Sequence, residues 1–127
     1  MKTIKRITID FIPQSEHRYD TCGDWQIEGD TMIVKVSLKP DERHQQLVAV
    51  HELVEALACN VDDISPEAVD VFDMGPGADL DEPGDSPEAP YHAQHVMATE
   101  IEKRLAEALH VAWDEYDAAV GDHGVRE

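Results

Sequence analysis

The sequence predicts a single α+β domain over residues 1–127, in which a small antiparallel sheet near the N-terminus packs on two main helices. Before residue 39, apolar and polar residues alternate as they do in strands with one buried face. Residues 40–60 and 91–111 instead repeat their apolar residues with the spacing of a helix. A chain of 127 residues can build one hydrophobic core but leaves no room for two ordinary domains.

The strands are predicted from short alternating segments. Ile7, Ile9 and Phe11 alternate with polar residues and predict the first strand. Residues 28–30, Glu-Gly-Asp, are typical of the tip of a β-hairpin, so a second strand is expected before them and a third after them. The apolar residues of this hairpin are Trp25 and Ile27 on one side and Met32, Val34, Val36 and Leu38 on the other.

The helices are predicted from signals at their ends. Residues 40–42, Pro-Asp-Glu, are typical of a first helical turn, and this helix is expected to run to about residue 60. Residues 65–67, Ser-Pro-Glu, predict the start of a short second helix. A long helix is expected over 91–111, followed by a short one over 113–120 that ends at a glycine.

An irregular acidic loop over residues 74–90 separates the two main helices. It contains three glycines and four prolines and cannot hold regular structure for long. A connection of this length in a compact domain is usually functional or disordered. We expect it to pack over or beside the candidate site and to restrict access to it, and a solvated connector is the alternative.

Charge is distributed unevenly along the chain. There are 28 acidic and 10 basic residues, a formal net charge of -18, and no lysine or arginine between Arg43 and Lys103. Most of these carboxylates are expected to form a solvated acidic surface, although a bound cation would also relieve their repulsion. Because binding to a phosphate backbone requires Lys and Arg, no nucleic-acid partner is expected.

The sequence predicts a cytoplasmic protein without membrane attachment. No charge-free apolar run approaches the roughly 18 residues that a membrane span needs, and residues 1–13 resemble a strand more than a signal peptide. Cys22 and Cys59 are too few for a disulfide scaffold and do not form a CxxC pair. Cys59 is expected to be a small core residue.

The segment LVAVHELVEALAC, residues 47–59, carries the main chemical signal, because it places His51, Glu52 and Glu55 on two turns of one helix. In an HExxH helix, two histidines one turn apart bind Zn²⁺, and the glutamate after the first activates a metal-bound water. Here Glu55 replaces the second histidine, and a carboxylate is also a zinc ligand. The motif predicts a divalent metal site, with Zn²⁺ as the expected ion and Glu52 as the general base. A plain His51–Glu55 hydrogen bond is the alternative.

Helical geometry brings a third ligand towards this motif. At about 100° per residue, His51 lies at the edge of the apolar face of its helix, with Glu55 beside it. In the helix over 91–111, His95 lies at the edge of the apolar face, with Glu102 two turns further on. Packing of the two faces is expected to bring His51, Glu55 and His95 to one point. The faces are predicted to consist of Leu47, Val50, Val54, Leu57 and Ala58 in one helix and Tyr91, Ala98, Ile101, Leu105 and Leu109 in the other.

Three further residues are candidates for supporting roles. Glu102 is unusual on a core face, so we expect it to hold a ligand histidine by a hydrogen bond or to act as a ligand itself. His92 would replace His95 if the helix were rotated or began later. Asp73, at the end of the predicted short helix, is a weaker candidate for the same roles.

The segments RYDTCGDW, HELVEALAC, VDVFD and APYHAQHVMATEIE together resemble the zincin superfamily, and in particular small HExxE zincin-like proteins of phages and prophages. This resemblance implies a motif helix packed on a small twisted sheet and a third metal ligand from a downstream helix. It implies that His51 and Glu55 are the helix ligands, Glu52 the general base and His95 the downstream ligand. It also implies a zinc-dependent peptidase acting on a peptide or protein, located in the bacterial host cytoplasm if the chain is phage-encoded.

Two other classes of function stay open. Glu52-x-x-Glu55 followed by Asp70-x-x-Asp73 is also the acidic pairing of Mg²⁺-dependent nucleotide pyrophosphohydrolases, which are all-helical. Against this class, the N-terminal third predicts strands and no nearby Lys or Arg could hold a phosphate chain. The second alternative is a non-catalytic acidic binding protein with a structural metal or none.

Overall fold

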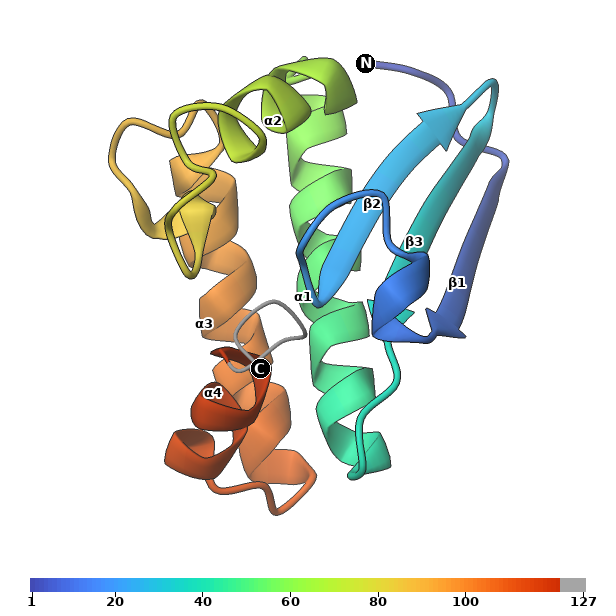
Figure 1. The fold of residues 1–127 in the computed structure, drawn as a ribbon. Helices are drawn as coiled ribbons and strands as arrows, with labels where there is room; N and C mark the ends of the chain where they lie inside the picture. The colour runs from blue at the N-terminus through green and yellow to red at the C-terminus, as the bar shows by residue number, and fades with distance from the viewer. Residues whose placement is uncertain (122–127) are drawn as a thin grey trace.

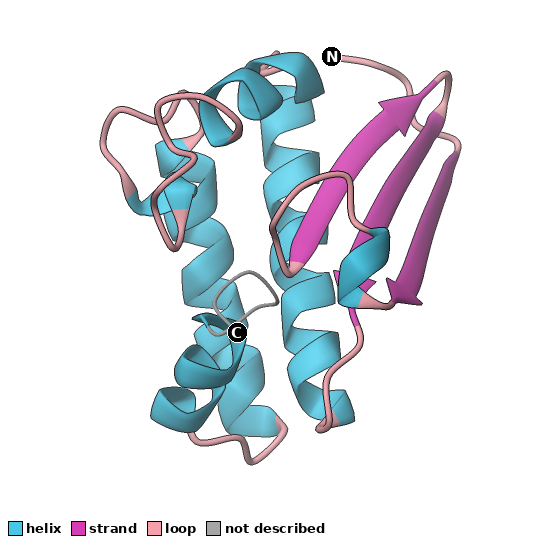
Figure 2. Cartoon of the chain, in the orientation of Figure 1, coloured by secondary structure: helices cyan, strands magenta, loops and turns pink. Residues whose placement is uncertain are grey.

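Helix α1 lies between a three-stranded sheet on one side and helix α3 on the other (Figures 1 and 2). The computed structural model describes residues 1–121, and the α+β class predicted from the sequence is confirmed. Its strands and helices are β1 (Arg6–Ile12), β2 (Gly23–Glu28), β3 (Thr31–Ser37), α1 (Glu42–Val61), α2 (Pro66–Asp73), α3 (His92–Ala108) and α4 (Trp113–Gly121), with short 3-10 turns η1 (Gln14–Glu16) and η2 (Pro83–Asp85).

The sheet has the strand order β1-β3-β2 and is mixed, whereas an antiparallel sheet was expected. Strands β2 and β3 form the predicted antiparallel hairpin, and Gly29 at its tip has a φ of 61°, which glycine adopts readily. Strand β1 pairs with β3 in parallel. The chain crosses the end of the sheet over residues 13–22, so β2 starts at the far edge and β3 returns between β2 and β1.

The start of α1 matches the sequence prediction, but its buried surface is wider than predicted. Asp41 caps the helix by accepting a hydrogen bond from the backbone N–H of Arg43 at 2.9 Å. Leu57 is 41% exposed, so the single apolar stripe predicted for this helix is wrong. Because α1 contacts the sheet and α3 on different sides, its buried residues extend around the helix: Gln45, Leu47, Val48, Ala49, His51, Glu55, Ala56 and Cys59.

The buried stripe of α3 consists of small and polar residues. Ala98 is buried as predicted, whereas Ile101 is 40% exposed, which corrects the predicted face. The stripe comprises His95, Ala98, Glu102 and Ala106, whose spacing of three or four residues places them on one side of a helix. His95 is therefore a member of the buried stripe of α3 rather than a residue at the edge of a buried face.

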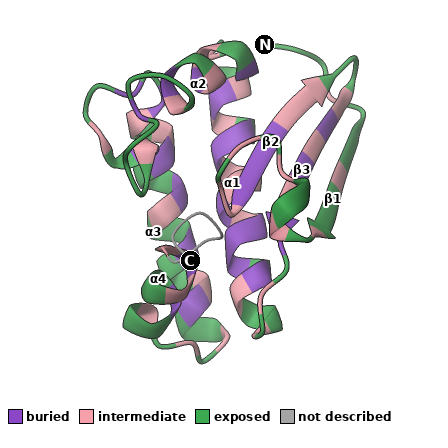
Figure 3. Ribbon diagram, viewed as in Figure 1, coloured by how far each residue is buried: buried purple, intermediate pink, exposed green. Residues whose placement is uncertain are grey.

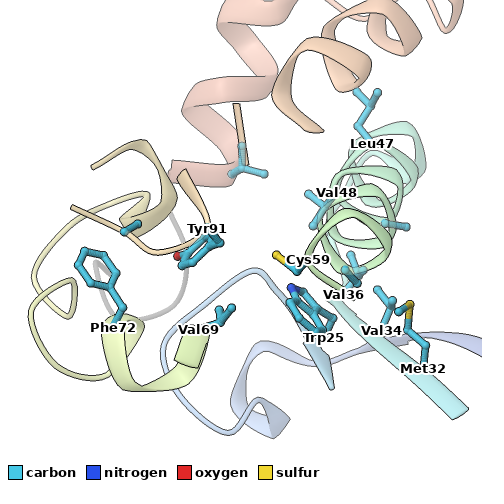
Figure 4. Packing of buried hydrophobic residues seen from close by; sticks show 14 of the residues in the cluster. Trp25, Met32, Val34, Val36, Leu47, Val48, Cys59, Val69, Phe72 and Tyr91 are labelled. Atoms are coloured by element: carbon cyan, nitrogen blue, oxygen red, sulfur yellow. The ribbon is translucent and has the colours of Figure 1, made fainter. Parts of the chain in front are cut away.

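The core fills the space between the sheet and α1. Trp25 of β2 lies close to Cys59 of α1, and Val34 and Val36 of β3 lie against the same helix (Figure 4). Cys59 is fully buried, as predicted. Burial is concentrated along α1 and on the inner face of β2 and β3, while much of β1 is exposed (Figure 3). Among residues 1–121, no helix has both the length and the apolar character to span a membrane.

Candidate metal centre

Three side-chain atoms from α1 and α3 meet between the two helices. The Nε2 atom of His51 lies 3.2 Å from Oε2 of Glu55 and 3.2 Å from Nδ1 of His95, and Oε2 of Glu55 lies 3.0 Å from that Nδ1. All three residues are buried, with 4–7% of their surface exposed. The structure therefore places the three ligands expected from the sequence around one point.

Local geometry explains the convergence. His51 and Glu55 are four residues apart on α1, so one helical turn places them side by side. His95 reaches them from α3, where Ala98, one turn further on, is fully buried at the helix contact. The rings of His51 and His95 are close to perpendicular, with centroids 4.7 Å apart and an interplanar angle of 68°.

The outer nitrogen of each histidine is bound to a carboxylate. Nδ1 of His51 lies 2.8 Å from Oε1 of Glu102, and Nε2 of His95 lies 2.9 Å from Oδ1 of Asp85. Since an ionised carboxylate can only accept hydrogen bonds, each of these nitrogens carries the proton and donates it. In the neutral tautomers, Nε2 of His51 and Nδ1 of His95 carry no proton, so their lone pairs point at each other and at the carboxylate of Glu55. Such an arrangement requires a cation, which is either a proton or a metal ion.

The pKa shifts of His51 and Glu55 also indicate that the cluster requires a positive charge. Burial alone lowers the pKa of His51, but hydrogen bonds to Glu102 and Glu55 outweigh burial and leave this pKa well above its ordinary value. Burial raises the pKa of Glu55, but its bonds to His51 and His95 outweigh burial and lower this pKa below the ordinary range. The carboxylate of Glu55 is therefore held ionised and stabilises positive charge beside it.

Glu52 lies next to these three residues without being part of the cluster. Its Oε2 is 4.0 Å from Nε2 of His51, and the side chain lines the adjoining cavity. Burial and the nearby charge of Glu55 raise the pKa of Glu52 well above its ordinary value. The β2 backbone passes so close that a Cβ atom on Gly23 would lie 2.7 Å from Cγ of Glu52. Glycine at position 23 thus makes room for the Glu52 side chain.

Four supporting residues were not recognised in the sequence. Trp25 donates a hydrogen bond of 3.2 Å from Nε1 to Oε1 of Glu55, and Tyr116 of α4 donates one to Glu102. Asp85 of η2 accepts from His95, and a Cβ atom on the neighbouring Gly84 would lie 2.4 Å from the imidazole ring of His95. In the sequence, the only sign that the backbone approaches His95 closely is the pair Gly84-Asp85 within the Pro-rich loop.

The supporting candidates predicted from the sequence have separate positions. Glu102 forms a hydrogen bond with His51, which is the first of the two roles expected for it from the sequence. His92 is half-buried, and its Nδ1 lies 2.9 Å from the carbonyl oxygen of Gly84, away from the three converging atoms. Asp73 accepts hydrogen bonds from Tyr19, at 3.2 Å, and from Tyr91. Neither His92 nor Asp73 belongs to a possible metal-binding group within residues 1–121.

A cavity of about 400 Å³ adjoins the cluster. Its walls come from residues 19–25, α1, α2, the loop, α3 and α4, and they include residues 78–84 of the loop. The loop thus packs beside the site, as expected, and also binds it through Asp85. Seven acidic residues besides the cluster and its partner Glu102 line this cavity: Asp20, Asp24, Glu52, Asp73, Asp79, Asp81 and Glu82.

Comparisons with protein families, with curated proteins and with solved structures found no match to this chain. The resemblance to zincins therefore remains a prediction from the sequence.

Proposed function

We propose that His51, Glu55 and His95 bind one divalent metal ion, with Zn²⁺ as the best fit, and that the protein is a metal-dependent hydrolase of peptide bonds. Two imidazole nitrogens and one carboxylate oxygen are the donor set of catalytic zinc sites that keep a fourth position for water or substrate. The observation that carries the proposal is the convergence of these three atoms at 3.0–3.2 Å from one another.

The size of this cluster fits a zinc ion. Tetrahedral zinc with bonds of about 2.0–2.2 Å separates its ligands by roughly 3.3–3.6 Å. The observed separations of 3.0–3.2 Å require an expansion of only a few tenths of an ångström. The carboxylates of Glu102 and Asp85 hold the outer N–H groups, which is the usual way in which proteins orient metal-binding histidines.

The position of Glu52 supports a catalytic role. When bound, zinc would acidify a water and polarise the scissile carbonyl. Glu52 has a raised pKa and faces the cavity, so it can accept a proton from water and return it to the leaving amine. Trp25 holds the second oxygen of Glu55 and leaves Oε2 directed at the cluster.

The cavity walls argue against a phosphate substrate. Within the described chain, neither lysine nor arginine lines the cavity, whereas a nucleotide pyrophosphohydrolase must neutralise a phosphate chain. Asp70 is bound to Arg18 at 3.0 Å, and Asp73 accepts from two tyrosines, so these acids are engaged in other contacts. A neutral or cationic peptide segment suits the acidic walls better.

The test compares two neighbouring histidines of α3. We expect isothermal titration calorimetry of the metal-stripped full chain with Zn²⁺ to show about one ion per chain. His95→Ala should weaken this binding by more than the ~10–100-fold typical of outer contacts. His92→Ala is the matched control, because His92 lies on the same helix but its imidazole binds the Gly84 carbonyl. Equal losses in both variants, or no binding by the unmodified chain, would overturn the proposal.

A further inference from the structure

Within residues 1–121, no strand pairs with the outer edge of β1. The backbone N–H of Arg6 bonds to the Asp30 carbonyl at 3.3 Å, and the carbonyl of Ile12 accepts from Leu38 at 2.8 Å. The even-numbered residues of β1 therefore direct their backbone groups towards β3. By alternation, the N–H and C=O groups of Ile7, Ile9 and Phe11 point away from the sheet.

The inner face of β1 is apolar but poorly covered. Ile7, Ile9 and Phe11 are in register with Met32, Val34 and Val36, so they share the face of the sheet that packs on α1. The three β3 residues are fully buried, whereas the three β1 residues are 44%, 39% and 42% exposed. The difference arises because α1 packs over β2 and β3, which leaves β1 outside its cover (Figure 3).

The usual protection of an edge strand is absent from β1. Monomeric proteins block such edges with proline, lysine, bulges or very short strands. Strand β1 has seven residues and contains no proline, lysine or glycine. Its two charges, Arg6 and Asp10, are opposite in sign and both exposed.

We propose that two copies of this chain associate by antiparallel pairing of their β1 strands about Thr8, which joins the two sheets into one. This register places Arg6 of each copy opposite Asp10 of the other, and Ile7 opposite Ile9. The free backbone groups of Ile7 and Ile9 then bond to each other across the two-fold axis. Opposite charges facing each other on adjacent strands stabilise the pairing.

Charges around β1 are compatible with this association. Residues 1–39 contain six basic and six acidic residues, so the acidic excess of the chain lies in residues 40–127. In the existing sheet, Asp10 is already in register with Lys35 of β3. The second copy's Arg6 would extend this row of alternating charges. No residue of β1 lines the cavity, so the association is independent of the metal proposal.

Charge reversal tests the register. By sedimentation velocity, the unmodified full chain should form a dimer of twice 14.2 kDa at micromolar concentration. Arg6→Glu alone and Asp10→Arg alone each place like charges opposite each other, so each should raise the dimer Kd by roughly 10-fold or more. An equimolar mixture of the two variants restores both opposite-charge pairs and should dimerise again. Arg104→Glu, at an exposed position of α3, is the control with the same charge change.

A disulfide provides the second test. Thr8 would face its own copy as a non-hydrogen-bonded pair with Cα atoms about 4.5 Å apart, which a disulfide can span. Thr8→Cys should therefore yield a covalent dimer on mild oxidation, while the unmodified chain does not. A monomeric native chain, a dimer unaffected by both charge reversals, or failure of Thr8→Cys to cross-link would each overturn the proposal.

Discussion

Oε1 of Glu102 lies 2.8 Å from Nδ1 of His51, and this contact determines that Nε2 of His51 faces His95 and Glu55. The carboxylate of Glu102 is itself held by Tyr116 of α4. The C-terminal helix is thus linked to the centre of the site through one buried carboxylate, which a survey of ligand atoms alone would miss.

Glu102→Gln should keep the fold but weaken Zn²⁺ binding by about 10–100-fold, because the amide lacks the negative charge that makes His51 a better ligand. Calorimetry measures the affinity, and circular dichroism checks the fold. Glu100→Gln, an exposed residue of the same helix, is the control and should bind normally. Normal affinity of Glu102→Gln would show that this contact does not affect the metal.

Glu52→Gln should abolish turnover while retaining the metal. The substitution keeps the shape of the side chain and removes the base, so a loss of about 10²–10⁴-fold in kcat is expected. Cleavage of a fluorogenic peptide library and elemental analysis of the same preparation measure the two quantities. Loss of metal together with activity would instead identify Glu52 as a ligand, and unchanged turnover would remove it from the mechanism.

Asp85→Asn should weaken metal binding although Asp85 lies in the irregular loop. The asparagine lacks the charge that holds the outer N–H of His95, so a loss of about 10–100-fold in Zn²⁺ affinity is expected. Asp79→Asn is the control in the same loop, since Asp79 lines the cavity without contacting His95. Replacement of residues 77–86 by a Gly/Ser linker also removes Asp85. If this variant keeps its Zn²⁺ affinity, the prediction is contradicted and the loop only covers the site.

Asp73 should make stability depend on pH. Burial raises the pKa of Asp73 from 3.8 to about 6, although bonds from Tyr91 and Tyr19 oppose this shift. Because the folded-state pKa lies above the unfolded value, the folded protein binds the proton more tightly, and this stabilisation is lost as pH rises through about 6.

Asp73→Asn removes this titration and keeps an acceptor oxygen for one of the two tyrosines. The unmodified chain loses this stabilisation as pH rises, whereas the variant does not. The free energy of unfolding of the variant in urea, minus that of the unmodified chain, should therefore increase as pH rises from about 4 to about 7. A constant difference between the two proteins across this range would show that Asp73 titrates normally in the folded state.

Contacts within one helix could be predicted from the sequence. His51, Glu52 and Glu55 have a fixed relative placement in any helix, so their proximity follows from spacing alone. The cap at Asp41 and the hairpin turn at Gly29 are likewise local, because they depend on neighbouring residues. The position of His95 opposite the motif was also predicted, although from apolar faces that were partly wrong.

Contacts between distant segments were decided by the tertiary structure. Asp85 reaches His95 because η2 folds against α3, and Trp25 reaches Glu55 because β2 lies beside α1. The path of residues 13–22 made β1 parallel to β3, and the two-sided packing of α1 left Leu57 exposed. Periodicity along the chain records which residues share a face of an element, but it contains no information on which face of another element they meet. The placement of His51 and Glu55 on one helix was therefore determined by the sequence, and the carboxylates and indole that contact the cluster were determined by long-range packing.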